Sequence, residues 1–167
     1  GNSFSNIYEL KKTGGAIGEQ VSSLRISQEG TKIVAGIIEE SGAKNKVTSI
    51  GLNGQNQSLL FESEKSGVFI DAWSEKSNKI AYSEGCINCD GNLVSPVIRD
   101  LSTNKTTKLS EKAQPGTMTT VEGNTDLSQI VIVYGKADTA PGDGIGINIV
   151  APYTVSKVDT STGKESV

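Results

Sequence analysis

One turn phrase occurs twice in this chain. The segments "DLSTNK" (100–105) and "DTSTGK" (159–164) share the pattern Asp-x-Ser-Thr-(Asn/Gly)-Lys, 59 residues apart. The leading Asp can accept hydrogen bonds from turn amides, and Asn or Gly tolerates the positive φ that tight hairpins need. A hairpin that recurs in this way indicates that the fold repeats one structural unit.

Short apolar runs rich in β-branched residues flank these hairpins, and turns containing Gly, Asn or Ser separate the runs. This alternation predicts strands rather than helices, and 19 glycines in 167 residues fit many turns. The expected strands are 32–40, 46–52, 58–62, 68–74, 79–83, 96–101, 106–109, 117–123, 129–135, 154–159 and 165–167.

The strands recur with a period of 40–50 residues. Ser27 and Lys32 align with Ser74 and Lys79 at an offset of 47, whereas Ile130 follows Ile80 by 50, which we interpret as a longer turn before 129. Four strands at this period are typical of propeller blades. The sequence thus predicts an all-β single domain (1–167) of about three and a half antiparallel four-stranded β-propeller-type blades: a half blade at 6–21 and blades at about 22–63, 67–110 and 117–167. A β-sandwich remains the alternative, since strand number alone does not separate the two.

The segment "DAWSEKSNKIAYS" (71–83) resembles the W-S-P-D-G-x-K-I-A-Y/F phrase of TolB-like propellers. It matches at Trp73, Ser74 and Lys79–Tyr82, and Glu75–Ser77 replace the Pro-Asp-Gly. "RISQEGTKIV" (25–34) is a second partial match, and "VIRDLSTNKTTKL" (97–109) is similar to the family's third strand and turn. The resemblance implies blades over residues 6–167 and a periplasmic, secreted or cell-surface location.

The resemblance specifies blades and not an activity, because propellers host many functions. The first interpretation is a non-enzymatic binding or scaffold module that uses its loop face for a protein or ligand partner. The second is an accessory propeller of a larger enzyme, similar to those of prolyl-oligopeptidase-like peptidases. The third is a structural subunit that self-associates through its blade edges.

Two cysteines, Cys86 and Cys89, lie in "GCINCDGN" (85–92). A redox Cys-x-x-Cys pair begins a helix, and no helix is expected here. A zinc site needs about four ligands, and this chain adds no histidine. We therefore predict a small disulfide between the two, with the redox pair and the half metal site as alternatives.

Loops between the second and third strands share one face of a propeller, and binding residues concentrate on such loops. The loops at 84–94 and 136–148 are the longest of this kind. The expected binding residues there are Asp90, Asn92, Asp138, Asp143 and Asn148. The oxygen-rich stretch 138–148 leaves a weak case for Ca²⁺, although it lacks the spacing of an EF-hand loop.

Composition excludes several function classes. The chain has no histidine and no Gly-x-Ser-x-Gly, so we expect no hydrolytic activity, no catalytic residues and no cofactor. A net charge of −3 without a basic cluster argues against nucleic acid. No apolar run approaches the roughly 20 residues that span a bilayer, so no membrane span is expected. The same ligand count argues against a metal ion.

Overall fold

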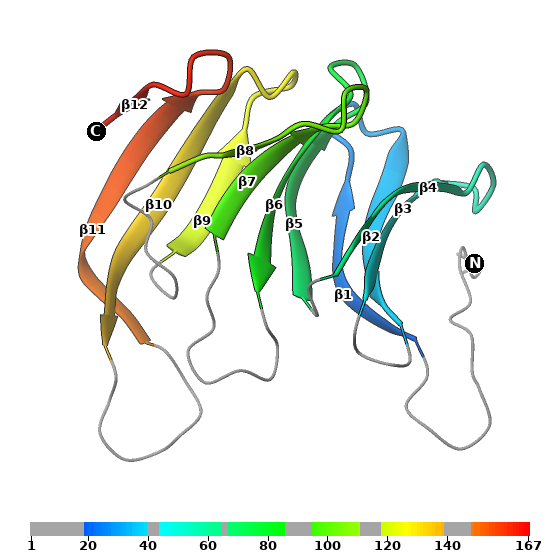
Figure 1. Cartoon of the computed structure of the whole chain (residues 1–167), viewed down its shortest axis with the longest axis horizontal. Coiled ribbons are helices and arrows are strands. Elements are labelled where there is room, and N and C mark those ends of the chain that lie inside the picture. Colours follow the sequence, from blue (N-terminus) through cyan, green and yellow to red (C-terminus); the bar gives the residue numbers. More distant parts are fainter. Residues whose placement is uncertain (1–18, 40–43, 65–66, 86–94, 111–117, 139–147) are drawn as a thin grey trace, which may run out of the picture.

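The computed structural model describes residues 19–39, 44–64, 67–85, 95–110, 118–138 and 148–167. These residues form three antiparallel four-stranded sheets, which we call blades 1, 2 and 3, and no helix occurs among them (Figure 1). Blade 1 contains β1 (Gln20–Ile26), β2 (Lys32–Ile38), β3 (Asn45–Gly51) and β4 (Ser58–Ser63). Blade 2 contains β5 (Gly67–Ser74), β6 (Lys79–Gly85), β7 (Ser95–Asp100) and β8 (Thr106–Lys108). Blade 3 contains β9 (Met118–Gly123), β10 (Gln129–Asp138), β11 (Asn148–Asp159) and β12 (Glu165–Ser166).

The predicted all-β fold of four-stranded antiparallel blades is confirmed, because each sheet pairs its strands in chain order. Gln20 and Val21, which the sequence analysis placed at the end of the half blade 6–21, belong to β1. They pair with Ile38 and Ile37 of β2, so this stretch completes blade 1. The rest of the half blade, residues 6–18, lies outside the described residues.

The repeated Asp-x-Ser-Thr phrase forms the hairpin between the third and fourth strands. Asp100 Oδ1 accepts hydrogen bonds from the amides of Ser102 and Thr103, both at 2.9 Å. Asp159 Oδ1 accepts from the two equivalent amides at 3.0 Å. Asn104 and Gly163 have φ of 59° and 69°, as the turn chemistry predicted.

The turn between the first and second strands has one length in all three blades. The strand pair next to this turn is Ile26 with Ile33 in blade 1, Trp73 with Ile80 in blade 2, and Gly123 with Ile130 in blade 3. Each pair is seven residues apart, so the expected longer turn in blade 3 is wrong. The three extra residues between blades 2 and 3 lie outside this turn.

The hydrophobic core forms two layers, one at each junction between blades. Sheet alternation sends every second side chain to the neighbouring blade, and each layer is buried between two sheet faces. At the blade 1–2 junction the layer contains Val34, Val47, Phe61, Val68, Ile70, Trp73, Ile80 and Tyr82. At the blade 2–3 junction it contains Ala72, Ala81, Ile98, Leu109, Val121, Leu127, Ile130, Ile132 and Val158.

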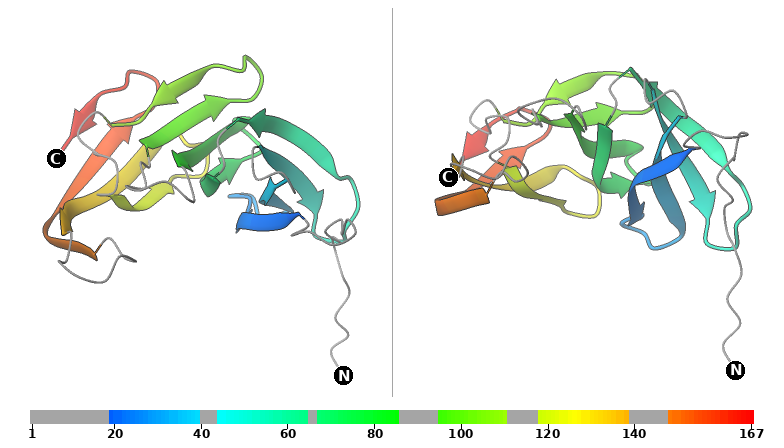
Figure 2. Two further views of the ribbon diagram at one scale, coloured as in Figure 1. Left: turned by 60° about the horizontal axis from the view of Figure 1, so that its bottom comes forward. Right: turned by 90° about the horizontal axis from the view of Figure 1, so that it is seen from below.

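The blades follow one another along an arc (Figure 2). The first strand of each blade lies on the concave side of this arc, and β5 contacts β1 on one side and β9 on the other. The fourth strands lie on the convex side. Besides its convex side, the arc has an inner, concave surface and two outer faces, one on blade 1 and one on blade 3.

Candidate functional site

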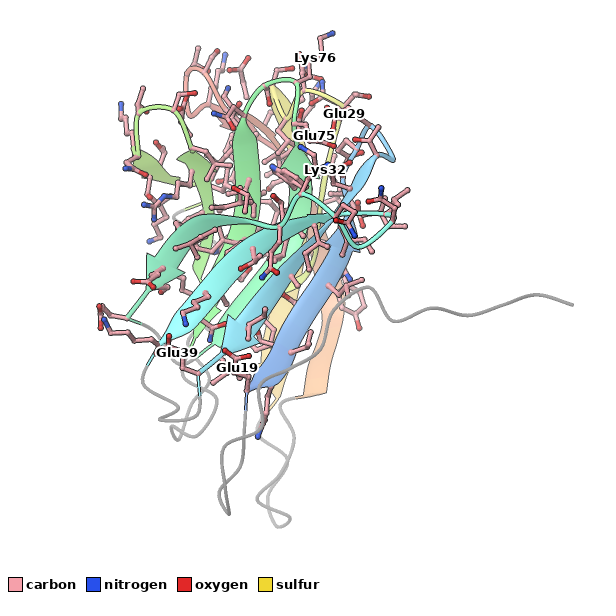
Figure 3. The ribbon with its side chains drawn as sticks, turned by 90° about the vertical axis from the view of Figure 1, so that its right-hand side faces the viewer. Glu19, Glu29, Lys32, Glu39, Glu75 and Lys76 are labelled. Atoms are coloured by element: carbon pink, nitrogen blue, oxygen red, sulfur yellow. The ribbon has the colours of Figure 1, made fainter. Side chains whose placement is uncertain are left out.

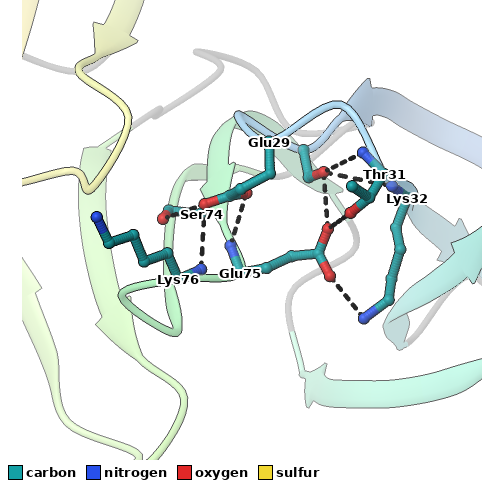
Figure 4. A network of polar contacts seen from close by, with 7 residues as sticks. Glu29, Thr31, Lys32, Ser74, Glu75 and Lys76 are labelled. Carbon is teal, nitrogen blue, oxygen red and sulfur yellow. Dashed lines mark hydrogen bonds and ion pairs between the residues drawn. The ribbon is translucent and has the colours of Figure 1, made fainter.

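A polar network joins the first turn of blade 1 to that of blade 2 (Figures 3 and 4). Glu29 accepts hydrogen bonds from Ser74 Oγ at 2.9 Å, from the Glu75 amide at 3.0 Å and from the Lys76 amide at 3.1 Å. Burial acts to raise the pKa of Glu29, but these three bonds hold it below its usual value. The carboxylate of blade 1 therefore stays ionised and caps the turn of blade 2.

Glu75 completes the same network from the opposite side. Its carboxylate forms an ion pair with Lys32 Nζ at 2.6 Å and accepts hydrogen bonds from Ser27 Oγ at 2.9 Å and from Thr31 Oγ1. Burial opposes ionisation, but Lys32 and the two hydroxyls lower the pKa of Glu75. Lys32 Nζ also lies 5.8 Å from the centre of the Trp73 ring. We call the set Glu29, Lys32, Ser74, Glu75 and Lys76 the latch.

A second ion pair lies at the opposite end of blade 1, where Figure 3 shows Glu19 and Glu39. Lys46 Nζ lies 2.5 Å from Glu39 Oε1 and lowers the pKa of that carboxyl. Both residues belong to blade 1, so this pair does not link blades. The latch therefore differs from it in joining two blades.

Hydrogen bonds between serine side chains of blade 1 and backbone groups of blade 2 also cross the blade 1–2 junction. Ser22 Oγ and Ser23 Oγ donate to the carbonyl oxygen of Val68 at 2.8 and 3.1 Å, and Ser23 Oγ accepts from the Ile70 amide at 3.0 Å. Gly36 makes this approach feasible, because a Cβ there would lie 2.5 Å from Ser22 Oγ. The polar side chains of this junction hold the two blades together.

The inner surface carries one carboxyl with an altered proton affinity. Asp71 lies at a bulge in β5, where the register with β6 shifts between Ile70 and Ala72. Bulges commonly redirect a side chain, and here Asp71 Oδ2 accepts a hydrogen bond from Ser83 Oγ at 2.9 Å. Burial raises the pKa of Asp71 to about 7, with Ser83 and Arg25 lowering it and Glu122 raising it further. Arg25 lies on β1 and Glu122 on β9, so charges from all three first strands act together.

The outer face of blade 3 exposes apolar side chains. Val131 of β10 and Val155 of β11 are 41% and 56% exposed. Their equivalents face the next blade: Val34 and Ala81 correspond to Val131, and Val47 and Pro96 correspond to Val155. All four equivalents are buried. At these two positions the outer face of blade 3 thus matches a packing face, whereas Lys157, which pairs with Val131, is an exposed charged exception.

Most of the predicted loop site lies outside the described residues. This holds for Asp90, Asn92 and Asp143, and for Cys86 and Cys89, so the disulfide and the loop site stay predictions. Asp138 and Asn148 pair at the ends of β10 and β11. The described ends of β2, β6 and β10, which precede these loops, lie along one edge of the arc (Figure 1).

Neither a metal site nor a membrane helix is found in the described part of the chain. Its His, Cys, Asp and Glu side chains form no group of three or more that could hold a metal ion. Within the same residues no helix is long and apolar enough to cross a membrane.

Comparison with known proteins identifies the fold. Over 90% of its length the chain is similar to the β-propeller domain of the Trilobed protease from Pyrococcus furiosus, with 16% identity and a TM-score of 0.57, and covers 42% of that chain. It is similar over 87% to a chain in the crystal structure of a nidogen–laminin complex, with 7% identity and a TM-score of 0.56, and covers 46% of it. A putative dipeptidyl aminopeptidase IV from Bacteroides ovatus is similar over 88%, with 9% identity, a TM-score of 0.57 and 22% coverage.

The fold is a partial β-propeller. The chain spans less than half the length of each of these three structures. No family model matches it, so the finer resemblance to TolB-like propellers stays a prediction. No curated protein matches the sequence either.

Sequence reasoning did not identify Asp71 or the latch as sites. Asp71 is the one charged residue in the apolar run "VFIDAW", and this break in the apolar pattern could have identified it from the sequence. The latch was less accessible, because Glu29 and the turn that it caps lie 45 to 47 residues apart in the sequence.

Proposed function

We propose that this chain is a three-blade segment of an accessory β-propeller, a non-catalytic domain of a larger protein whose ring is completed by further blades. The observation that carries the proposal is the exposure of Val131 and Val155 at positions that are buried at both inner junctions. Apolar patches of this kind mark interaction surfaces. The similarity to propeller domains of peptidases supports an accessory role.

The occupant of this face is a further blade rather than a second copy of blade 1. On the outer face of blade 1, Ile33 and Ile37 are already buried, although Leu24 and Ile26 on the same face are exposed. Blade 1 therefore offers a less complete apolar counterpart than a blade that has no cover of its own. In blades 2 and 3 the matching face presents Ile80 and Ile130 to the preceding blade, and both are fully buried.

The role within the larger protein is positioning or binding, because the chain contains no histidine. The location outside the cytoplasm and the loop-face partner remain part of this proposal. An activity assay tests the proposal that the chain is non-catalytic. The purified chain is expected to hydrolyse neither ester nor peptide substrates, and turnover that copurifies with the chain through successive steps would contradict it.

Sedimentation velocity over a concentration series tests the open face. The isolated chain is expected to associate as its concentration rises, since Val131 and Val155 are exposed apolar side chains. The double variant Val131→Lys/Val155→Lys is expected to remain monomeric. Leu52→Lys is the matched control, because Leu52 is 50% exposed in the turn after β3, away from this face. This variant should associate like the unmodified chain. A strictly monomeric unmodified chain at high concentration overturns the proposal, and so does association that persists in the double variant.

A further inference from the structure

A polar cavity lies between blade 2 and blade 3. Its volume is about 150 Å³, and it is lined by Lys79, Ile98, Asp100, Thr103, Lys105, Thr107 and Thr160. All but Thr160 belong to blade 2 or its last hairpin, and Thr160 follows β11 of blade 3. This space is large enough for several water molecules, so a small ion fits.

The cavity exists because Thr160 is smaller than its counterpart in the preceding blade. Leu101 and Thr160 each follow the Asp that opens the repeated hairpin. Leu101 packs against the apolar layer of the blade 1–2 junction. Thr160 instead donates its hydroxyl hydrogen to the carbonyl oxygen of Leu127 at 2.7 Å. Replacing an isobutyl group by this hydroxyl leaves the junction unfilled.

The blade 2–3 junction also lacks the carboxylates of the latch. Lys79 occupies the position of Lys32, whose partner is Glu75. The residue equivalent to Glu75 in blade 3 is Thr125, and the residue equivalent to Glu29 in blade 2 is Lys76. Among the ion pairs of the described residues, none involves Lys79 or Lys105.

One acid remains in the lining, and it is already engaged. Asp100 Oδ1 accepts from the amides of Ser102 and Thr103. The hydrogen bond from the Thr103 amide lowers the pKa of Asp100 most, and the positive charge of Lys79 lowers it further. Asp100 is therefore ionised at neutral pH, and two lysines against one carboxylate leave the lining with one excess positive charge.

We propose that this cavity binds a small tetrahedral oxyanion of the phosphate type, which takes the place of the missing glutamate between blades 2 and 3. The ammonium groups of Lys79 and Lys105 supply the charge. The Thr103 hydroxyl is hydrogen-bonded to Asp100 and accepts from the Lys105 amide at 3.4 Å, so it serves the turn and not the anion. Thr107 lines the same cavity and supplies a hydroxyl donor.

Titration with inorganic phosphate at constant ionic strength tests the proposal. Amide resonances around Lys79 and Lys105 are expected to shift in a saturable way, and phosphate is expected to raise the Tm beyond an equal ionic strength of sodium chloride. Lys79→Gln and Lys105→Gln should each weaken binding about fivefold, the effect of one partly exposed charge pair. Asp100→Asn keeps the turn acceptor and removes the repulsion, so it should tighten binding.

Two further variants separate a cavity site from general charge screening. Thr160→Leu installs the side chain of Leu101 and should abolish the saturable shifts. Lys157→Gln is the matched control, since Lys157 is exposed on β11 and does not line the cavity. Phosphate shifts that do not saturate, or that Lys157→Gln weakens as much as Lys105→Gln does, overturn the proposal. If Thr160→Leu does not fold, Lys105→Gln decides, because Lys105 is exposed in a turn.

Discussion

The two junctions between blades share their apolar packing and differ in their polar contacts. Ile80 and Ile130 occupy the same position in successive blades, and both are fully buried. At the blade 1–2 junction, Glu29 and Glu75 then add the latch above this layer. At the blade 2–3 junction Ser110 Oγ donates to Glu165 Oε2 at 3.0 Å, next to the fourth strands of the two blades.

The difference shows which positions a repeat must keep. Every junction needs the apolar layer, because stacking is how a blade buries its sheet faces. Polar contacts at the rim are exposed in part and contribute less, so their positions are free to diverge. In blades 2 and 3 this divergence replaced Glu29 by Lys76 and Glu75 by Thr125.

The largest expected effect tests the shared layer. Ile80→Ala and Ile130→Ala should each lower the free energy of unfolding by about 2–5 kcal/mol, because each removes a fully buried side chain and leaves a cavity. Chemical denaturation of both variants gives the comparison. Equal losses support equivalent layers, whereas a loss under about 1 kcal/mol at either site would show that its junction is not tightly packed.

The second prediction breaks the latch. Glu29→Ala should lower the free energy of unfolding by about 1–3 kcal/mol, since it removes a charged acceptor from two amides and a hydroxyl. Lys76→Ala, at the equivalent position of the next blade, should change it by less than about 0.5 kcal/mol. The folded-state pKa of Glu29 is lowered, so its contribution is present above the unfolded pKa and is lost as the pH falls through the folded value. A Glu29→Ala effect that is unchanged under strongly acidic conditions would contradict the ionic latch.

Much of the fold was predictable because its signals are local. Strand alternation and the Asp-x-Ser-Thr turns depend on adjacent residues, and Asp100 and Asp159 bond as expected. Leu127 shows the limit of this reasoning. Its φ of 53° is typical of glycine, and the burial of its side chain in the blade 2–3 layer accounts for a leucine there.

The candidate sites were less predictable, because they depend on register and on distant pairs. The bulge at Asp71 arises from how β5 pairs with β6, which no local pattern specifies. The latch and the cavity depend on residues of successive blades, whose side chains become neighbours only after stacking.

The third prediction concerns the inner surface, where the blades meet without a latch or a cavity. The folded-state pKa of Asp71, about 7, lies above its ordinary value of 3.8. Between these values the folded chain holds a proton that the unfolded chain has released, so the free energy of unfolding falls as the pH rises from about 4 to about 7. Asp71→Asn keeps an acceptor for Ser83 and has no proton to lose.

The variant should therefore match the unmodified chain near pH 4 and exceed its stability by about 1–2 kcal/mol at pH 8. Denaturation at both pH values measures this difference. Arg25→Gln is a useful second variant, because loss of the positive charge from β1 should raise the pKa of Asp71 further. The free energy of unfolding should then fall more steeply as the pH rises. A stability difference that does not change with pH would show that Asp71 is ionised throughout this range.

The smallest expected effect rebuilds the latch where it is missing. Thr125→Glu places a carboxylate at the position of Glu75, within the turn that faces Lys79 across the blade 2–3 junction. The pair is expected to add about 0.2–1 kcal/mol, as for partly exposed ion pairs, because the capping glutamate of the original latch has no counterpart here. A double-mutant cycle with Lys79→Gln isolates this coupling from any effect of the new charge alone. The same substitution should also weaken phosphate binding, because the new carboxylate competes for Lys79. Zero coupling energy in the cycle, with the fold intact, would show that Lys79 does not occupy the place that Lys32 holds in blade 1.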